Sequence, residues 1–239
     1  MLTELQKRTA QAIVNIFETG RARGDYASVT LLPGDAGHLT YGRSQATLAS
    51  GNLHLLIQAY CDEPKADRGD ALTPYLERLA AIDLSLDRDQ AFHAALKAAG
   101  GDPAMQDVQD RFFDRAYWAP ATKAAVALGL STALAAAVIY DSHVHGSWRV
   151  LRERTSREHG EAARLGERSW IAAYVAERRD WLATHSNPLL RRTVYRMDEF
   201  RLLIGSGNWR LDLPLRVRGV RIDLASLGLP NALADGGAS

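Results

Sequence analysis

Residues 131–140 read STALAAAVIY, and the side chains from Ala133 to Ile139 are all apolar. A helix that is apolar on every side has to be surrounded by other elements, because no face of it can lie against water. The run therefore predicts a central buried helix over Ser131–His145. No uncharged apolar run in the chain reaches the roughly 18 residues that span a bilayer, so we expect no membrane insertion.

The segments around this helix are mostly helical as well. In the first, Thr3–Thr19, Thr3 is suited to be the N-cap and Gly20 follows as a natural stop. Strand-like residues at Tyr26–Leu32 and His38–Tyr41 flank turn residues at 33–37, which predicts a short β-hairpin. Apolar residues at helical spacing predict further helices at Gln45–Tyr60, Thr73–Ala81, Arg88–Ala99, Pro103–Tyr117, Pro120–Leu128, Ser169–Thr184 and Pro188–Gly205. Short extended pieces follow from Leu211, and we expect a frayed tail at 231–239.

The composition is that of a globular chain of 239 residues, with 46% hydrophobic and 24% charged residues. The net charge of +1 argues against a nucleic-acid partner, which a strongly basic surface would attract. Cys61 is the single cysteine, so no internal disulfide can form. The start, Met1–Gln11, lacks the apolar core of a signal peptide. We therefore expect a protein made in the cytoplasm that reaches its substrate after lysis or by specialised secretion, or a domain of a larger protein.

Two carboxylates stand where acid–base chemistry needs them. Glu18 lies in the last turn of the first predicted helix, where the negative end of the helix dipole and apolar neighbours disfavour its charged form and suit a general acid. Asp35 lies in the hairpin turn, and Thr40 follows on the second strand, where its hydroxyl can orient a water. A helix end and a turn can oppose two carboxyls across a cleft, as an inverting glycosidase requires at about 6.5–9.5 Å. Each carboxylate alone is better explained as an ordinary surface residue, so the prediction rests on the pair.

Asp141 directly follows the apolar run, so we predict that it is buried. A buried carboxylate without a partner is costly, which predicts an arginine beside it. Arg178, Arg192 and Arg196 are the candidates. We expect a structural role for these ion pairs, such as clamping two lobes together.

His143 and His145 do not predict a metal site. Side chains two residues apart on a helix point about 200° away from each other, and no third ligand is in view. The chain also has no phosphate-binding loop, dinucleotide fingerprint or nucleophile elbow. We therefore expect neither a metal nor a cofactor.

Three motifs follow one another along the chain: DAGHLT at 35–40 after Glu18, VQDRFFDRAYWAPA at 108–121, and IYD at 139–141 with HG at 145–146 and RLLIGSGN at 201–208. Together they cover nearly the whole chain and resemble glycoside hydrolase family 46, the chitosanases, which belong to the lysozyme-like superfamily. In that family a catalytic Glu ends the first long helix. An Asp then opens a short segment whose sixth residue is a Thr that helps to hold the water. Glu18, Asp35 and Thr40 stand in these places.

The resemblance implies a mainly α, lysozyme-like α+β fold over 1–239, with two helical lobes, a small β-hairpin near the N-terminus and a cleft between the lobes. It implies single-displacement hydrolysis without a metal or cofactor. Glu18 would be the general acid, Asp35 the general base and Thr40 a ligand of the water. The resemblance also implies substrate contacts by Gly37, His38, Asn52 and His145, and a structural ion-pair network of Asp141, Arg178 and Arg196.

Two departures from the family pattern bear on the substrate. Chitosanases hold the glucosamine ammonium with an acidic residue where this chain has Asn52, and they carry an Arg where it has Gly37. Loss of the acidic residue removes a charge-assisted contact and favours neutral N-acetylated sugars. We therefore prefer peptidoglycan, cleaved by a muramidase-type endo-β-1,4-glycosidase, with chitosan as the alternative and a non-catalytic glycan-binding module as a rival of another class.

A peptidoglycan hydrolase without a signal peptide would be a phage endolysin or a secreted antibacterial effector. We expect it to act on its polysaccharide as a monomer. An effector would bring an immunity or inhibitor protein as a partner.

Overall fold

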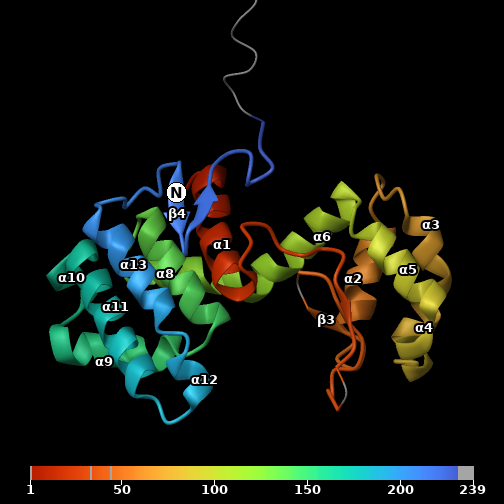
Figure 1. The fold of residues 1–239 in the computed structure, drawn as a ribbon, viewed down its shortest axis with the longest axis horizontal. Coiled ribbons are helices and arrows are strands. Elements are labelled where there is room, and N and C mark those ends of the chain that lie inside the picture. The colour runs from red at the N-terminus through yellow and green to blue at the C-terminus, as the bar shows by residue number, and fades with distance from the viewer. Residues whose placement is uncertain (1, 33, 44, 231–239) are drawn as a thin grey trace, which may run out of the picture. The chain divides into compact units, whose positions relative to one another are not determined.

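The structure is a computed structural model that describes residues 2–32, 34–43 and 45–230. The chain forms two units, unit 1 from Met1–Arg23 and Tyr117–Ser239, and unit 2 from Gly24–Ala116. The described elements of unit 1 are α1 (Glu4–Thr19), α7 (Ala119–Ala127), α8 (Ala133–Val144), α9 (Trp148–His159), α10 (Ala162–Leu165), α11 (Glu167–Thr184), α12 (Pro188–Arg191), α13 (Tyr195–Gly205), β4 (Leu215–Val217) and β5 (Val220–Ile222) (Figure 1).

Unit 2 carries a small sheet and a set of short helices. Its described elements are β1 (Val29–Thr30), β2 (Thr40–Tyr41), β3 (Ala46–Thr47), α2 (Asn52–Cys61), α3 (Gly69–Leu72), η1 (Thr73–Tyr75), α4 (Leu76–Ala80), η2 (Leu84–Arg88), α5 (Gln90–Ala99) and α6 (Pro103–Phe113). A π-helical turn, η3 (Asp114–Trp118), follows α6. The fold class is mainly α with small antiparallel sheets, as predicted.

The apolar run forms α8, and its residues from Ala133 to Ser142 are all buried, which confirms the predicted central helix. Helices α1, α7, α9, α11 and α13 pack around it. Thr132 caps α8 by accepting a hydrogen bond from the Ala135 N–H at 3.3 Å. Glu167 accepts hydrogen bonds from the N–H groups of Ser131 and Thr132, which satisfies further donors at this helix end.

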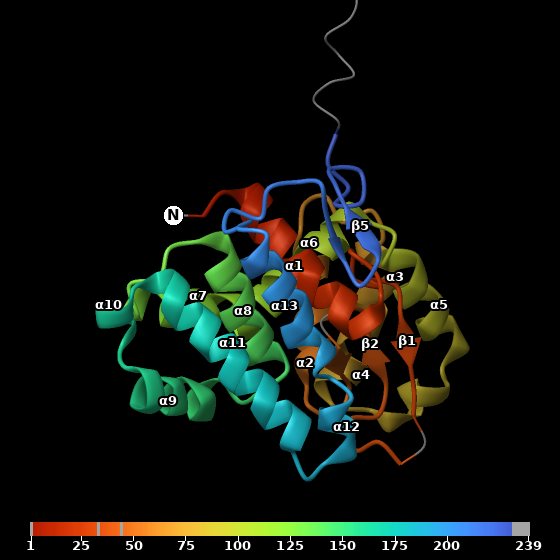
Figure 2. The same cartoon turned by 60° about the vertical axis from the view of Figure 1, so that its left-hand side comes forward.

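Helix α1 has the bounds that its capping residues predict. Thr3 and Gln6 form a capping box at its start, and Gly20 ends it with a left-handed φ of 74°. Ile13, Ile16 and Phe17 lie on its buried side against unit 1. Helix α11 lies alongside α9 and α13, and all three helices contact α8. In Figure 2, α11 runs in front of α8.

The predicted hairpin in unit 2 has shorter strands than expected and belongs to a three-stranded sheet. The order is β1-β2-β3, with Val29 opposite Tyr41 and Thr40 opposite Thr47. The third strand lies where a helix from Gln45 to Tyr60 was predicted, so the first half of that prediction is wrong. Gln45 and Gly51 have φ values of 48° and 75°, which interrupt a helix, and α2 begins only at Asn52.

Residues of helix α6 form hydrogen bonds with the segments that flank the strands of this sheet. The buried Gln109 donates to the carbonyl of Tyr26 at 2.8 Å and accepts from the N–H of Arg43 at 2.8 Å. Its neighbour Asp110 accepts a hydrogen bond from the Tyr26 hydroxyl at 2.9 Å. The motif at 108–121 therefore begins with residues that position the strands.

Two other helix predictions need correction, and one long helix was not predicted. The segment Pro188–Gly205 is two helices, because a turn at 192–194 separates α12 from α13, and the Thr193 hydroxyl there donates back to the Leu190 carbonyl at 2.7 Å. The segment Thr73–Ala81 starts as a 3-10 turn, η1, before α4. Helix α9 was not predicted, because few apolar residues mark its sequence WRVLRERTSREH.

Gly100–Pro103 forms the turn between α5 and α6 inside unit 2. From Leu211 onward the extended pieces pair as the antiparallel strands β4 and β5. The expected frayed tail at 231–239 lies outside the described residues. Among the described residues, no helix is long and apolar enough to cross a membrane.

Candidate active site

Glu18 is held by the C-terminal end of α1, which is anchored on both sides of it. The residue before it, Phe17, packs edge-on against Phe200 with ring centroids 5.4 Å apart, and its carbonyl accepts a hydrogen bond from the Tyr195 hydroxyl at 2.8 Å. Gly20 then turns the chain away. The side chain of Glu18 is 42% exposed, so a substrate can reach it.

A chain of hydrogen-bonded charges runs from Glu18 into the core of unit 1. Arg196 donates from Nη2 to Glu18 Oε1 and from Nη1 to Asp141 Oδ1, the latter at 2.7 Å. Asp141 Oδ2 accepts from Arg178 Nη1 at 2.5 Å, and Arg178 Nη2 lies 3.2 Å from His145 Nδ1. Asp141 and Arg178 are fully buried, and Arg196 is 3% exposed. The network therefore fixes Arg196, which in turn orients one oxygen of Glu18.

The buried part of this network holds two arginines and one carboxylate, and the exposed Glu18 supplies the second negative charge. Burial would raise the pKa of Asp141, but Arg178 and Arg196 outweigh it and hold the pKa below its usual range. Burial first, and then the positive charges of Arg196 and Arg178, lower the pKa of His145 to about 4. Asp141 is thus ionised and His145 neutral near pH 7. Since a guanidinium only donates, neutral His145 accepts at Nδ1 and carries its proton on Nε2.

The low pKa of His145 predicts a loss of stability on mild acidification. The unfolded histidine takes up a proton near pH 6.5, whereas the folded one resists until about pH 4. Its contribution is therefore complete above pH 6.5 and is lost progressively as the pH falls toward 4. We expect the Tm of the wild type to fall over this range, and that of His145→Gln to fall less, as thermal unfolding followed by circular dichroism would measure. Equal slopes for the two proteins would contradict the assignment.

Asp35 lies in the predicted turn of unit 2 and is exposed. Its Oδ1 accepts a hydrogen bond from the N–H of Gly37 at 2.9 Å, and its carbonyl accepts from the N–H of His38 at 3.2 Å. These bonds fold the segment tightly around the Asp35 backbone. The turn itself therefore orients the side chain. Among the described residues, Oδ2 of Asp35 has no hydrogen-bond partner.

The remaining predicted residues of unit 2 follow directly along the chain. Thr40 is half-buried on β2, and its hydroxyl donates to the His38 carbonyl at 3.3 Å. Gly37 packs closely on Thr47, since a Cβ added there would lie 3.0 Å from Thr47 Cγ2. Asn52 is exposed at the first position of α2.

Each unit thus gathers its own group of predicted residues. Unit 1 joins Glu18, Arg196, Asp141, Arg178 and His145 into one network. Unit 2 places Asp35, Gly37, His38 and Thr40 in one turn, with Asn52 on the helix that follows. The predicted choice among three arginines resolves to Arg178 and Arg196, without Arg192. Because all members of the network belong to unit 1, the idea that it clamps two lobes is wrong.

Sequence reasoning missed two residues that shape these groups. Asp87 accepts hydrogen bonds from the turn at His38 and Leu39, and Tyr195 holds the end of α1. Asp87 lies next to a predicted helix start and gave no separate signal, because its partners are about fifty positions away. Within the described residues, no cluster of three His, Cys, Asp or Glu side chains could hold a metal ion.

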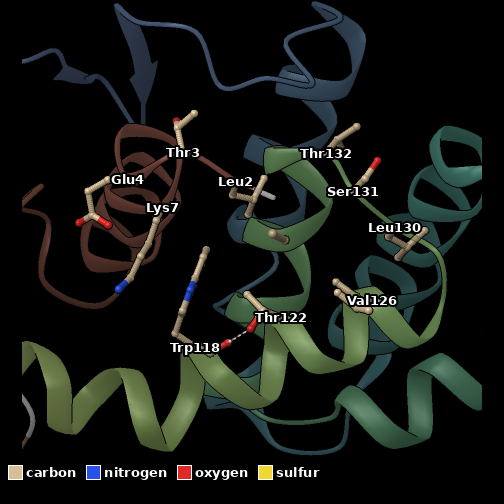
Figure 3. Close-up of a pocket in the computed structure, with 12 residues that line it drawn as sticks. Leu2, Thr3, Glu4, Lys7, Trp118, Thr122, Val126, Leu130, Ser131 and Thr132 are labelled. Carbon is tan, nitrogen blue, oxygen red and sulfur yellow. Dashed lines mark hydrogen bonds between the residues drawn. The ribbon is translucent and has the colours of Figure 1, made fainter.

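A cavity of about 370 Å³ lies in unit 1 between α1, α7 and α8 (Figure 3). Its lining is mostly apolar and includes Leu2, Trp118, Val126 and Leu130. None of the predicted site residues belongs to this lining. The cavity is therefore separate from the groups described above.

Comparison with known proteins identifies the class. A curated chitosanase of Bacillus subtilis (strain 168) is 30% identical over 231 residues, which cover 91% of this chain and 83% of the relative. A mutant chitosanase from Bacillus subtilis MY002, solved in complex with 6 GlcN, shares 29% identity and a TM-score of 0.69, with 91% of this chain and 96% of that chain covered. A family-46 chitosanase of Gynuella sunshinyii in complex with chitotetraose shares 26% identity and a TM-score of 0.68, with 93% and 98% covered.

The protein is therefore an endo-acting glycoside hydrolase. It belongs to glycosyl hydrolase family 46, whose model matches residues 12–215. The resemblance stated from the three sequence motifs is confirmed.

Proposed function

We propose that the protein is a chitosanase, an endo-hydrolase of β-1,4-linked glucosamine polymers that inverts the anomeric centre. The observation that carries the proposal is the match to family 46 over residues 12–215, together with relatives whose structures hold 6 GlcN and chitotetraose. Glu18 and Asp35, one in each unit, are the two carboxylates that we assign to the reaction.

The arrangement of each group suits its role in a single displacement. Glu18 transfers its proton to the glycosidic oxygen as the bond to the sugar carbon breaks. Asp35 takes a proton from a water that attacks the same carbon from the opposite face, and the Thr40 hydroxyl binds that water. Arg196 occupies only Oε1 of Glu18, which leaves Oε2 to carry the transferred proton.

The substrate contacts that we propose are those implied by the family resemblance. Neutral His145 presents its Nε2–H as a donor for a sugar hydroxyl. His38 has its Nδ1 against a carboxylate, which only accepts, so a neutral His38 presents Nε2 as an acceptor. Asn52 offers an amide oxygen to the glucosamine nitrogen in place of a carboxylate. Gly37 contributes backbone only.

Peptidoglycan, our preference from the residues Asn52 and Gly37, is not supported by the relatives, which are chitosanases and in two structures hold 6 GlcN and chitotetraose. A neutral amide keeps a hydrogen bond to an ammonium and loses only the charge assistance. The change at Asn52 is therefore too small an argument to outweigh a family match over most of the chain.

The proposal predicts soluble glucosamine oligomers from chitosan and no muropeptides from purified peptidoglycan. Mass spectrometry of the products identifies the polymer that is cut, and NMR in the first minutes should show α-anomeric reducing ends, as inversion of a β-linkage requires. If the protein released muropeptides and no glucosamine oligomers, its substrate would be peptidoglycan and not chitosan. Binding of chitosan without product would indicate a glycan-binding module.

A further inference from the structure

Asp87 joins the turn that carries Asp35 to a distant part of unit 2. It lies in the 3-10 helix η2, and its side chain is only 13% exposed. Its Oδ2 lies 2.7 Å from His38 Nδ1, and its Oδ1 accepts a hydrogen bond from the N–H of Leu39 at 3.0 Å. The two carboxylate oxygens of Asp87 therefore bind two consecutive residues of the turn, His38 and Leu39.

His38 has a backbone conformation that needs such support. Its φ of 59° lies in the left-handed region, where a side chain with a Cβ is disfavoured. Its N–H closes the turn by donating to the Asp35 carbonyl, and its own carbonyl accepts from the Thr40 hydroxyl. A change of backbone angle at His38 would therefore shift Asp35 relative to Thr40.

We propose that Asp87 is a positioning residue for the hydrolysis. By holding the His38 ring and the Leu39 N–H, it keeps the left-handed turn in which Asp35 and Thr40 have a fixed separation. The inference rests on the proposed function, in which these two groups act on the same water. Placement matters because an error of about 1 Å between reacting groups can reduce the rate a hundredfold.

The test is the pair Asp87→Ala and Asp87→Asn. The alanine removes both contacts, and we expect kcat on chitosan to fall about 10- to 100-fold. KM should rise by a smaller factor, because Asp87 affects sugar binding only through the His38 ring that it orients. The asparagine oxygen can still accept from Leu39, and its amide can donate to the other tautomer of His38, so most of the activity should return.

Asp83→Ala is the matched control. Asp83 caps the same 3-10 helix through the N–H of Ser85 and pairs with Arg78, and within the described part of the chain it makes no hydrogen bond or ion pair with the turn. It should lower Tm and leave kcat close to that of the wild type. A loss of kcat equal to that of Asp87→Ala would show that the helix as a whole matters, and would overturn the specific role of Asp87.

A rescue experiment separates positioning from stability. Glycine adopts a φ of 59° without steric cost, so His38→Gly in the Asp87→Ala background should raise kcat again by at least about threefold. KM of this double variant should rise, because the His38 ring assigned to the substrate is lost, so kcat is compared at saturating chitosan. Hydrogen exchange read by mass spectrometry should show faster uptake in residues 35–41 of Asp87→Ala than in Asp83→Ala, whatever the activity. If Asp87→Ala does not fold, Asp87→Ser takes its place in both measurements.

The possible results are distinguishable. Wild-type kcat in folded Asp87→Ala, or no change in exchange at 35–41, overturns the inference. An activity loss that matches the loss of folded protein, with normal kcat per folded molecule, also overturns it. Wild-type activity in Asp35→Asn would instead remove Asp35 from the role of base, and an absence of glucosamine oligomers from the wild type would remove the proposed function, while the exchange result would still report on the turn.

Discussion

Glu18→Gln is expected to lower kcat on chitosan by about 10²- to 10⁴-fold, the range that one general acid contributes. The amide has the shape of the carboxyl, and its oxygen can still accept from Arg196, so the network of unit 1 should stay intact. What it lacks is the proton that the glycosidic oxygen must receive. KM should change little, and steady-state release of reducing ends measures both constants.

Glu4→Gln is the matched control, because Glu4 lies at the other end of the same helix. Its side chain is 64% exposed and pairs with Arg8 on the surface. This variant should keep wild-type kcat and Tm. Wild-type kcat in Glu18→Gln would remove Glu18 from the role of acid.

The leaving group distinguishes acid from base. A glucosamine oligomer with a nitrophenyl leaving group departs with little help from a proton, so Glu18→Gln should recover much of its rate on it. Asp35→Asn lacks the group that activates water, and it should stay slow on both substrates. Recovery of both variants, or of neither, would contradict the division of roles.

Asp141→Ala is expected to lower the free energy of unfolding by about 3–5 kcal/mol, the usual cost of breaking a buried ion pair. The change leaves Arg178 and Arg196 buried side by side with no carboxylate between them. Urea unfolding at pH 7 measures the difference. Below about pH 4 the difference in unfolding free energy between the wild type and Asp141→Ala should become smaller. The folded protein holds the pKa of Asp141 low, so the stabilising contribution of this carboxylate is lost only when the acid is strong enough to protonate it.

Asp198→Ala provides the comparison on α11 and α13, the two helices that carry Arg178 and Arg196. Asp198 on α13 binds Arg179 on α11, but the two side chains are 46% and 33% exposed. A pair in contact with water contributes only about 0–1 kcal/mol, so this variant should stay close to the wild type. Equal destabilisation by Asp141→Ala and Asp198→Ala would show that the buried network adds nothing beyond a surface pair.

The substrate prediction shows how far one residue type can mislead. Asn52 is where the family resemblance puts an acidic residue, and this difference, with Gly37 in place of an Arg, favoured peptidoglycan. The absence of one negative charge at position 52 is weaker evidence about the substrate than the match to family 46 over residues 12–215. In unit 2, His38 in the turn and the exposed Asn52 at the start of α2 remain as polar groups, so the loss of one carboxylate does not make the surface unsuitable for an amino sugar.

Short-range signals in the sequence determined the central helix, the first helix and the turn at Asp35. The apolar run of α8, the capping box at Thr3 and the left-handed Gly20 act over a few residues, so their effects can be worked out from local spacing alone. The spacing of Asp35 and Thr40 within DAGHLT, with Glu18 before it, carried the family resemblance. The need for an arginine beside Asp141 also followed from its position after an apolar run.

Only the tertiary structure decided which distant residues meet. Arg196 reaches Glu18 across 178 positions of the sequence, and Asp87 reaches His38 across 49. The segment at Ala46–Thr47 became a strand because β2 lies beside it, although its own sequence continues a helical pattern. Such choices depend on packing and on pairing with partners far along the chain, and local propensity is too weak to overrule them.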